Sequence, residues 1–101
     1  MTKLIERISD MITDEIEGAK EYATCAIKHK NDLPTLAKTY YDIATDELRH
    51  VNLLHGEVVK LIETHRKEHG EPHASMLAVY EYLHEKQIKA VAEVRMILQQ
   101  Y

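Results

Sequence analysis

The chain has 101 residues, of which 45% are hydrophobic and 30% charged, and its formal net charge is −4. That length indicates one domain, residues 1–101, with a modest core, and domains of this size are often stabilised by oligomerisation. The negative charge, without a Lys/Arg cluster, argues against a nucleic-acid surface. The single Cys25 excludes an intrachain disulfide and any Cys-x-x-Cys metal module. Because no apolar run resembles a signal peptide or a membrane span, we expect a cytoplasmic protein that does not contact a membrane.

Apolar residues recur at helical spacing through most of the chain and predict three helices, at about 2–30, 33–69 and 73–100. Asp32 is expected to cap the second helix, and Pro34 is tolerated within its first turn. Gly70 and Pro72 form the clearest helix stop. No alternating strand pattern is present, so the sequence predicts an all-α fold in which the first two helices form an antiparallel hairpin.

Three polar residues occupy positions where the helical pattern calls for apolar ones. Glu15 belongs to the stripe of the first helix, and Glu47 and His50 belong to that of the second. The first stripe comprises Ile5, Ile8, Ile12, Glu15, Ala19, Tyr22 and Ala26, and the second comprises Leu36, Tyr40, Ile43, Glu47, His50 and Leu54. The neighbouring acids Asp14, Glu17 and Glu21 point away from these stripes. Glu15, Glu47 and His50 are therefore the candidate functional residues.

The distance of these residues from the interhelical turn provides a second criterion. Glu15 lies about 16 residues before the middle of the turn, and Glu47 and His50 lie about 15 and 18 residues after it. In an antiparallel hairpin with a rise of about 1.5 Å per residue, all three fall within roughly 5 Å of one level. We therefore expect the three side chains to face one another.

The chemistry of these side chains indicates a metal site. Buried carboxylates are costly unless they are paired, hydrogen-bonded or bound to a metal, and Glu and His at i and i+3 share a helix face. Carboxylate and imidazole donors suit iron or manganese, and zinc less selectively. One chain supplies three ligands, whereas two chains supply four carboxylates and two imidazoles, the ligand set of ferritin-like di-iron centres. The sequence thus predicts a homodimer with two metal ions at its interface.

The segments Asp14-Glu15-Ile16-Glu17, with Tyr22 beyond, and Asp46-Glu47-Leu48-Arg49-His50 resemble the ferritin-like superfamily, most closely the encapsulated ferritins. This resemblance implies half a ferritin bundle that becomes a four-helix bundle on dimerisation, together with a third long helix. It also implies a ferroxidase that oxidises Fe(II) to Fe(III) for iron storage or detoxification, inside a shell protein that forms a nanocompartment. Glu15, Glu47 and His50 would be the catalytic iron ligands, Tyr22 would support them, and Glu17 would lie on the iron entry route.

Two other functions are compatible with the same residues. A rubrerythrin-like peroxide reductase would need an external electron donor, and a non-enzymatic oligomerisation module would use the polar layer only to set register. A second Glu-x-x-His pair, Glu81 and His84, should lie level with Leu61 and more than about 10 Å from His50. We therefore expect Glu81 and His84 to be a solvated pair, with a second metal site as the alternative.

Overall fold

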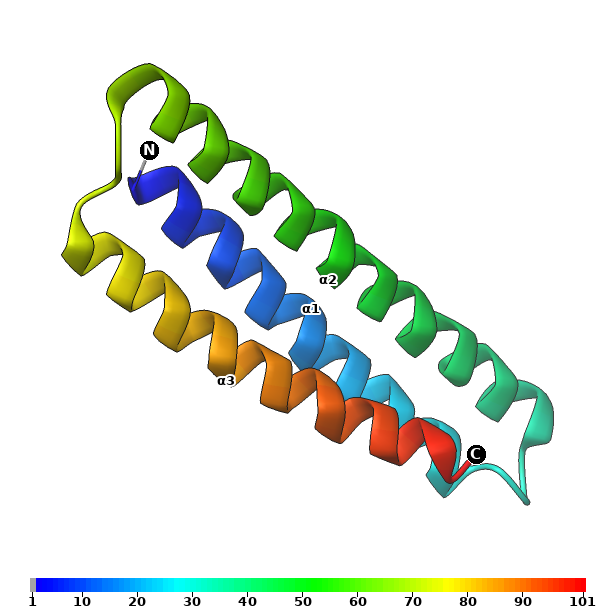
Figure 1. Ribbon diagram of the computed structural model, residues 1–101. Helices are drawn as coiled ribbons and strands as arrows, with labels where there is room; N and C mark the ends of the chain where they lie inside the picture. Colours follow the sequence, from blue (N-terminus) through cyan, green and yellow to red (C-terminus); the bar gives the residue numbers. More distant parts are fainter. Residues whose placement is uncertain (1) are drawn as a thin grey trace.

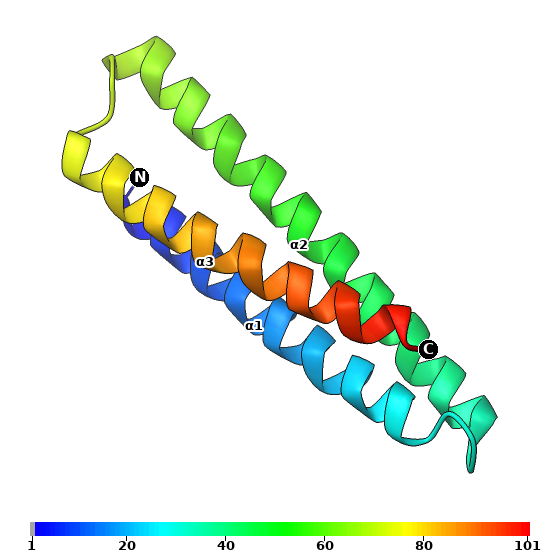
Figure 2. The ribbon, with the colours of Figure 1, turned by 60° about the horizontal axis from the view of Figure 1, so that its bottom comes forward.

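The computed structural model describes residues 2–101, and these residues form three helices joined by two short connections. Helix α1 spans Thr2–Lys28, α2 spans Pro34–His69 and α3 spans Ala74–Gln99. Helices α1 and α3 run in one direction and α2 runs in the other (Figures 1 and 2). The molecule is a rod of 56 × 18 × 18 Å, in which α1 packs against both other helices. The predicted all-α class is confirmed.

The positions of Pro34 and Gly70 at the ends of α2 are as predicted, but the N-terminal cap is not. Pro34 lies in the first turn of α2, and Gly70 ends the helix with a φ of 81°, a conformation that glycine adopts without steric cost. The prediction that Asp32 caps α2 is wrong. The N-cap is Leu33, which has no side-chain cap, while the Asp32 carboxylate pairs with the His29 imidazole at 3.3 Å. The Asp32 carboxylate therefore contacts the end of α1 and does not cap α2.

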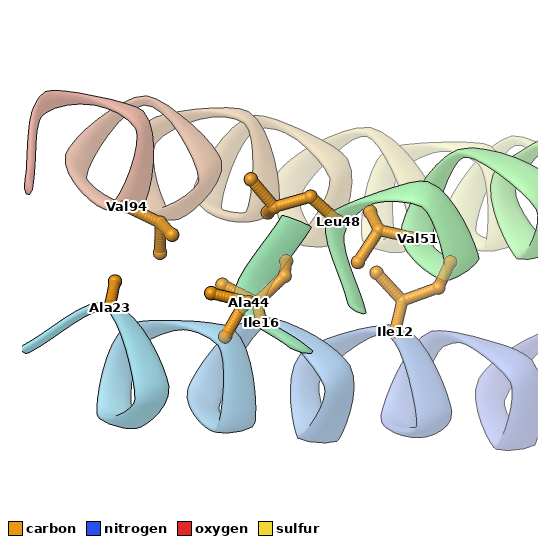
Figure 3. Close-up of a cluster of buried hydrophobic side chains, with 8 residues drawn as sticks. Ile12, Ile16, Ala23, Ala44, Leu48, Val51 and Val94 are labelled. Atoms are coloured by element: carbon orange, nitrogen blue, oxygen red, sulfur yellow. The ribbon is translucent and has the colours of Figure 1, made fainter. Parts of the chain in front are cut away.

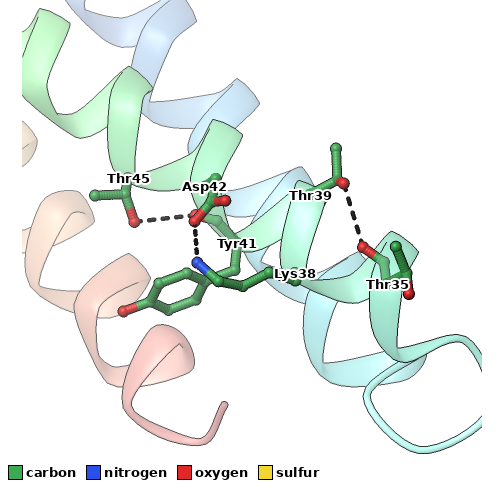
Figure 4. A network of polar contacts seen from close by, with 6 residues as sticks. All are labelled: Thr35, Lys38, Thr39, Tyr41, Asp42 and Thr45. Atoms are coloured by element: carbon green, nitrogen blue, oxygen red, sulfur yellow. Dashed lines mark hydrogen bonds and ion pairs between the residues drawn. The ribbon is translucent and has the colours of Figure 1, made fainter.

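Other polar contacts near the start of α2 stay within that helix. The hydroxyl of Thr39 donates to the carbonyl of Thr35, and that of Thr45 donates to the carbonyl of Tyr41 (Figure 4). Lys38 forms an exposed ion pair with Asp42, one turn away. These contacts support the helix locally and do not attach it to another element.

Small residues form the seam between α1 and α2. The alanines of this seam are fully buried, and they are Ala19, Ala23, Ala26, Ala37 and Ala44. Their small side chains let the two helix backbones approach closely. Larger side chains flank them in the main core cluster, where Leu48 and Val51 of α2 meet Ile12 and Ile16 of α1, and Val94 of α3 closes the cluster (Figure 3).

The buried face of α2 differs from the predicted one. The residues that are buried are Ala37, Ala44, Leu48, Val51, Val58 and Ile62. The predicted stripe, which includes Leu36, Ile43 and Leu54, lies beside this face, and Leu36 is 40% exposed. The difference arises because α2 must face both α1 and α3, so its buried surface is turned toward the side on which α3 packs.

Helix α3 is attached by one buried amide and by contacts at both ends. The Gln87 side chain donates to the carbonyl and the hydroxyl of Ser9 at 3.1 and 3.0 Å. Near the start of α3, Met76 and Tyr80 pack against a second cluster formed by Ile5 of α1 and Val58 and Ile62 of α2. Val58 and Ile62 of α2 are thus covered by α1 and α3 together, whereas residues 63–69 are exposed apart from half-buried His65.

Among residues 2–101, none of the helices combines the length and the apolar character that a membrane span requires.

Candidate metal centre

Glu15 and His50 meet across the α1–α2 hairpin, as their distances from the turn predict. The Nδ1 atom of His50 lies 3.4 Å from Oε2 of Glu15, within reach of a weak hydrogen bond or ion pair. Both side chains are partly exposed, by 43% for His50 and 32% for Glu15. When deprotonated, both atoms are ordinary metal donors, because each then presents a free lone pair.

Glu47 completes the group from the turn of α2 that precedes His50. Its Oε2 atom is buried and has no hydrogen-bond partner within the described residues. Burial raises the pKa of the Glu47 carboxyl, the nearby Glu15 carboxylate raises it further, and His50 opposes the shift. A buried carboxylate oxygen without a partner is unfavourable unless a proton or a cation reaches it. Its environment therefore fits a metal ligand.

The three residues lie on the side of the hairpin that faces away from α3. Helix α3 contacts α1 through Ser9 and Lys20, by way of Gln87 and Glu93. At about 100° per residue, Glu15 lies more than about 100° around α1 from both of these positions. On α2, His50 likewise lies more than about 100° around the helix from His55, which contacts His84 of α3. None of the helices in residues 2–101 therefore covers the centre from outside.

The same outward side of the hairpin carries apolar residues. Leu4 and Met11 on α1 are 48% and 40% exposed, and Leu36 on α2 is 40% exposed. They share helix faces with Glu15 and Glu47 through spacings of three, four and seven residues. Together these residues form a surface, here called the open hairpin face, on which exposed apolar side chains accompany the polar group.

Tyr22 lies on this face and contacts Tyr40 of α2, with ring centroids 5.9 Å apart. Sequence reasoning placed Tyr22 beside the candidate ligands but gave Tyr40 no part in the site. Glu17 lies elsewhere: it is exposed and lines a groove between α1 and α3 that also contains Lys86. The structure therefore brings Glu15, Glu47 and His50 together with Tyr22 on their face, but it does not bring Glu17 to them.

The second Glu-x-x-His pair is divided between two environments. Glu81 is exposed, as predicted. It lines a pocket together with Ile62 and Glu63 of α2, which directly follow Leu61, so Glu81 lies close to its predicted level. The prediction of a fully solvated pair is wrong for His84. The His84 ring stacks on His55 with centroids 4.3 Å apart and planes 2° apart. The two side chains thus do not act as one ligand pair.

Within residues 2–101, no group of three or more His, Cys, Asp or Glu side chains is arranged to hold a metal ion. Glu15, Glu47 and His50 are neighbours, yet one chain does not present them as a closed site. Sequence reasoning also gave no part to Gly18, although the Glu47 carboxylate lies directly against it. The available signal was an interior helical glycine one turn after Glu15.

Comparisons of the chain with protein-family models, with curated proteins and with solved structures give no significant match.

Proposed function

We propose that two copies of this chain bind two Fe(II) ions between their open hairpin faces and oxidise them to Fe(III), in a ferritin-like di-iron centre. The observation that carries the proposal is the buried Oε2 of Glu47, which lacks a hydrogen-bond partner in the group that Glu15 and His50 form. A cation at this point would relieve both the unpaired oxygen and the repulsion between the two carboxylates.

The donor set fits two ferrous ions in number and in charge. Two chains contribute four carboxylates and two imidazoles, as in ferritin-like centres built from paired helices. Four negative charges balance two divalent ions, so the filled centre is close to neutral. Oxygen and imidazole donors also accept Mn(II) or Zn(II), which serve as redox-inactive substitutes.

The open hairpin face supports a homodimer as the form that holds these ions. Exposed Leu4, Met11 and Leu36 would be buried by a second copy, and because each is already more than half covered, each would contribute about half of the roughly 1.5–3 kcal/mol of a full burial. The four hairpin helices of two copies would then form one bundle, with α3 of each copy on the outside. Dimerisation and ligand completion are thus one event in this proposal.

The protein residues bind and orient the substrate ions and accept or release protons. Fe(II) binds the deprotonated forms of Glu15, Glu47 and His50, so binding releases any proton that these groups carry. Two Fe(II) ions each give one electron to dioxygen, which takes up two protons and leaves as hydrogen peroxide. With peroxide as the oxidant, two electrons and two protons yield two water molecules. The carboxylates stabilise the higher charge of the ferric product.

The test combines native mass with iron oxidation. Anaerobic titration with Fe(II) should saturate at two ions per dimer and increase the dimer fraction in native mass spectrometry. Admission of air should then consume about one dioxygen per two Fe(II) and produce ferric absorbance. Glu15→Ala, Glu47→Ala and His50→Ala should each abolish saturable binding, whereas Asp14→Ala, which changes an exposed neighbouring acid, should not.

Three outcomes separate this function from its alternatives. A dimer that binds no metal would identify a helical oligomerisation module. Iron that turns over only with peroxide and an added electron donor would identify a rubrerythrin-like reductase. Full ferroxidase activity in Glu15→Ala would refute the assignment of the ligands.

A further inference from the structure

Gly18 is an interior helical residue whose backbone does not require glycine. Within residues 2–101, the only glycine with positive φ is Gly70, so Gly18 has the backbone conformation of an ordinary helical residue. Glycine in a helix interior is less favourable than alanine by about 1 kcal/mol. The presence of glycine here therefore calls for a reason outside the helix itself.

The reason lies in the space next to Gly18. A Cβ atom at this position would lie 2.3 Å from Oε2 of Glu47, 3.1 Å from its Cδ and 3.2 Å from its Oε1. The three nearest atoms all belong to the Glu47 carboxylate, so this group is the first that a side chain at position 18 would meet. Gly56 on α2 provides the contrast, since a Cβ there would meet nothing within 4 Å.

The position of this space relates Gly18 to the ligands. Gly18 follows Glu15 by three residues, so the two lie one turn apart along the same side of α1. The Glu47 side chain crosses from α2 to the α1 backbone at this point, beside the Glu15 carboxylate that contacts His50. A methyl group at position 18 would push the carboxylate away from α1.

We infer that Gly18 is a positioning residue of the metal centre: it leaves the room in which the Glu47 carboxylate lies against α1, within reach of Glu15. The inference deepens the proposed function and rests on it for the metal. The placement of Glu47 by Gly18, however, is a property of the metal-free chain. Gly18 touches no reacting atom and acts through Glu47.

The first measurement tests placement without any metal. Gly56→Ala should raise the melting temperature of the full-length protein by several degrees, because alanine replaces a helical glycine in open space. Gly18→Ala should change the melting temperature by a clearly different amount, because the added methyl group displaces the Glu47 carboxylate from its buried position. In a Glu47→Ala background, Gly18→Ala should become as stabilising as Gly56→Ala. An equal gain from both substitutions in the otherwise unchanged chain would overturn the inference.

The second measurement uses Mn(II) alone as the probe, by calorimetric titration. Gly18→Ala should weaken Mn(II) binding by about tenfold or more, the usual effect of losing a group that orients a ligand, while Gly56→Ala should leave it unchanged. Adding Glu47→Asp to Gly18→Ala should restore part of the affinity, because the shorter side chain needs less room. Unchanged affinity in Gly18→Ala would overturn the positioning role. If the unchanged protein binds no Mn(II) or Fe(II), the proposed function fails. The melting temperatures of Gly18→Ala with and without Glu47→Ala then still test whether Gly18 makes room for the Glu47 carboxylate.

Discussion

The imidazole rings of His55 on α2 and His84 on α3 lie face to face, with centroids 4.3 Å apart and planes 2° from parallel. The Tyr80 hydroxyl lies 3.1 Å from Nδ1 of His55 and donates to this atom in the neutral tautomer that carries its proton on Nε2. Burial lowers the pKa of His55, and the neighbouring His84 lowers it further. The contact between α2 and α3 at this level therefore depends on neutral imidazole.

This arrangement predicts that stability decreases in mild acid. The unfolded chain binds a proton at His55 near the ordinary value of 6.5, whereas the folded chain binds it only at lower pH. The contribution of neutral His55 to stability is therefore present above its ordinary pKa of 6.5 and is lost as the pH falls below that value. His55→Phe keeps an aromatic ring but does not titrate, so urea denaturation between about pH 7 and 5 should show a smaller slope of stability against pH. The control His69→Phe, at the exposed end of α2, should keep the slope of the unchanged protein.

Glu47→Gln should increase the stability of the metal-free protein. The amide keeps the shape of the side chain but removes a charge whose Oε2 is buried without a partner. At pH 7 we expect a gain on the order of 1 kcal/mol, together with a loss of Mn(II) binding. Thermal melting and calorimetric titration measure the two effects. The exposed Glu63→Gln should change neither, and a lower melting temperature for Glu47→Gln would contradict the account of the site.

Gln87→Ala should loosen α3. Gln87 is only 8% exposed, and its amide donates to the carbonyl and hydroxyl of Ser9 on α1. Because the substitution removes a buried donor from two acceptors, we expect a loss of about 1–3 kcal/mol in urea denaturation and faster amide hydrogen exchange in α3. Gln99→Ala, near the exposed end of the same helix, serves as the control. Equal exchange in both variants would show that this amide does not attach α3.

Ala44→Leu should separate the hairpin helices. Ala44 is fully buried in the seam between α1 and α2, so a larger side chain there must displace its neighbours in the core cluster. Overpacking of this kind typically costs about 1–3 kcal/mol, and the displaced helices should also weaken Mn(II) binding at Glu15 and Glu47. The comparison is Ala78→Leu at an exposed position of α3. If Ala44→Leu were as stable as Ala78→Leu, the seam between α1 and α2 would accommodate a larger side chain.

The proximity of Glu15 and His50 could be predicted because it follows from chain geometry. A short connection makes two helices antiparallel neighbours, so residues at equal distances from it lie at one level. The 3.4 Å contact confirms that prediction. Metal binding by these residues stays a prediction, since a single chain does not close the site within residues 2–101.

The sequence by itself determined the three helices and the level at which Glu15, Glu47 and His50 meet, because periodicity, Gly70 and Pro34 act locally. Only the tertiary structure decided which side of the hairpin α3 covers. Helical spacing defines an apolar surface wide enough for two neighbours, but it does not assign a neighbour to each half. That choice stacks His84 on His55 and leaves the open hairpin face uncovered.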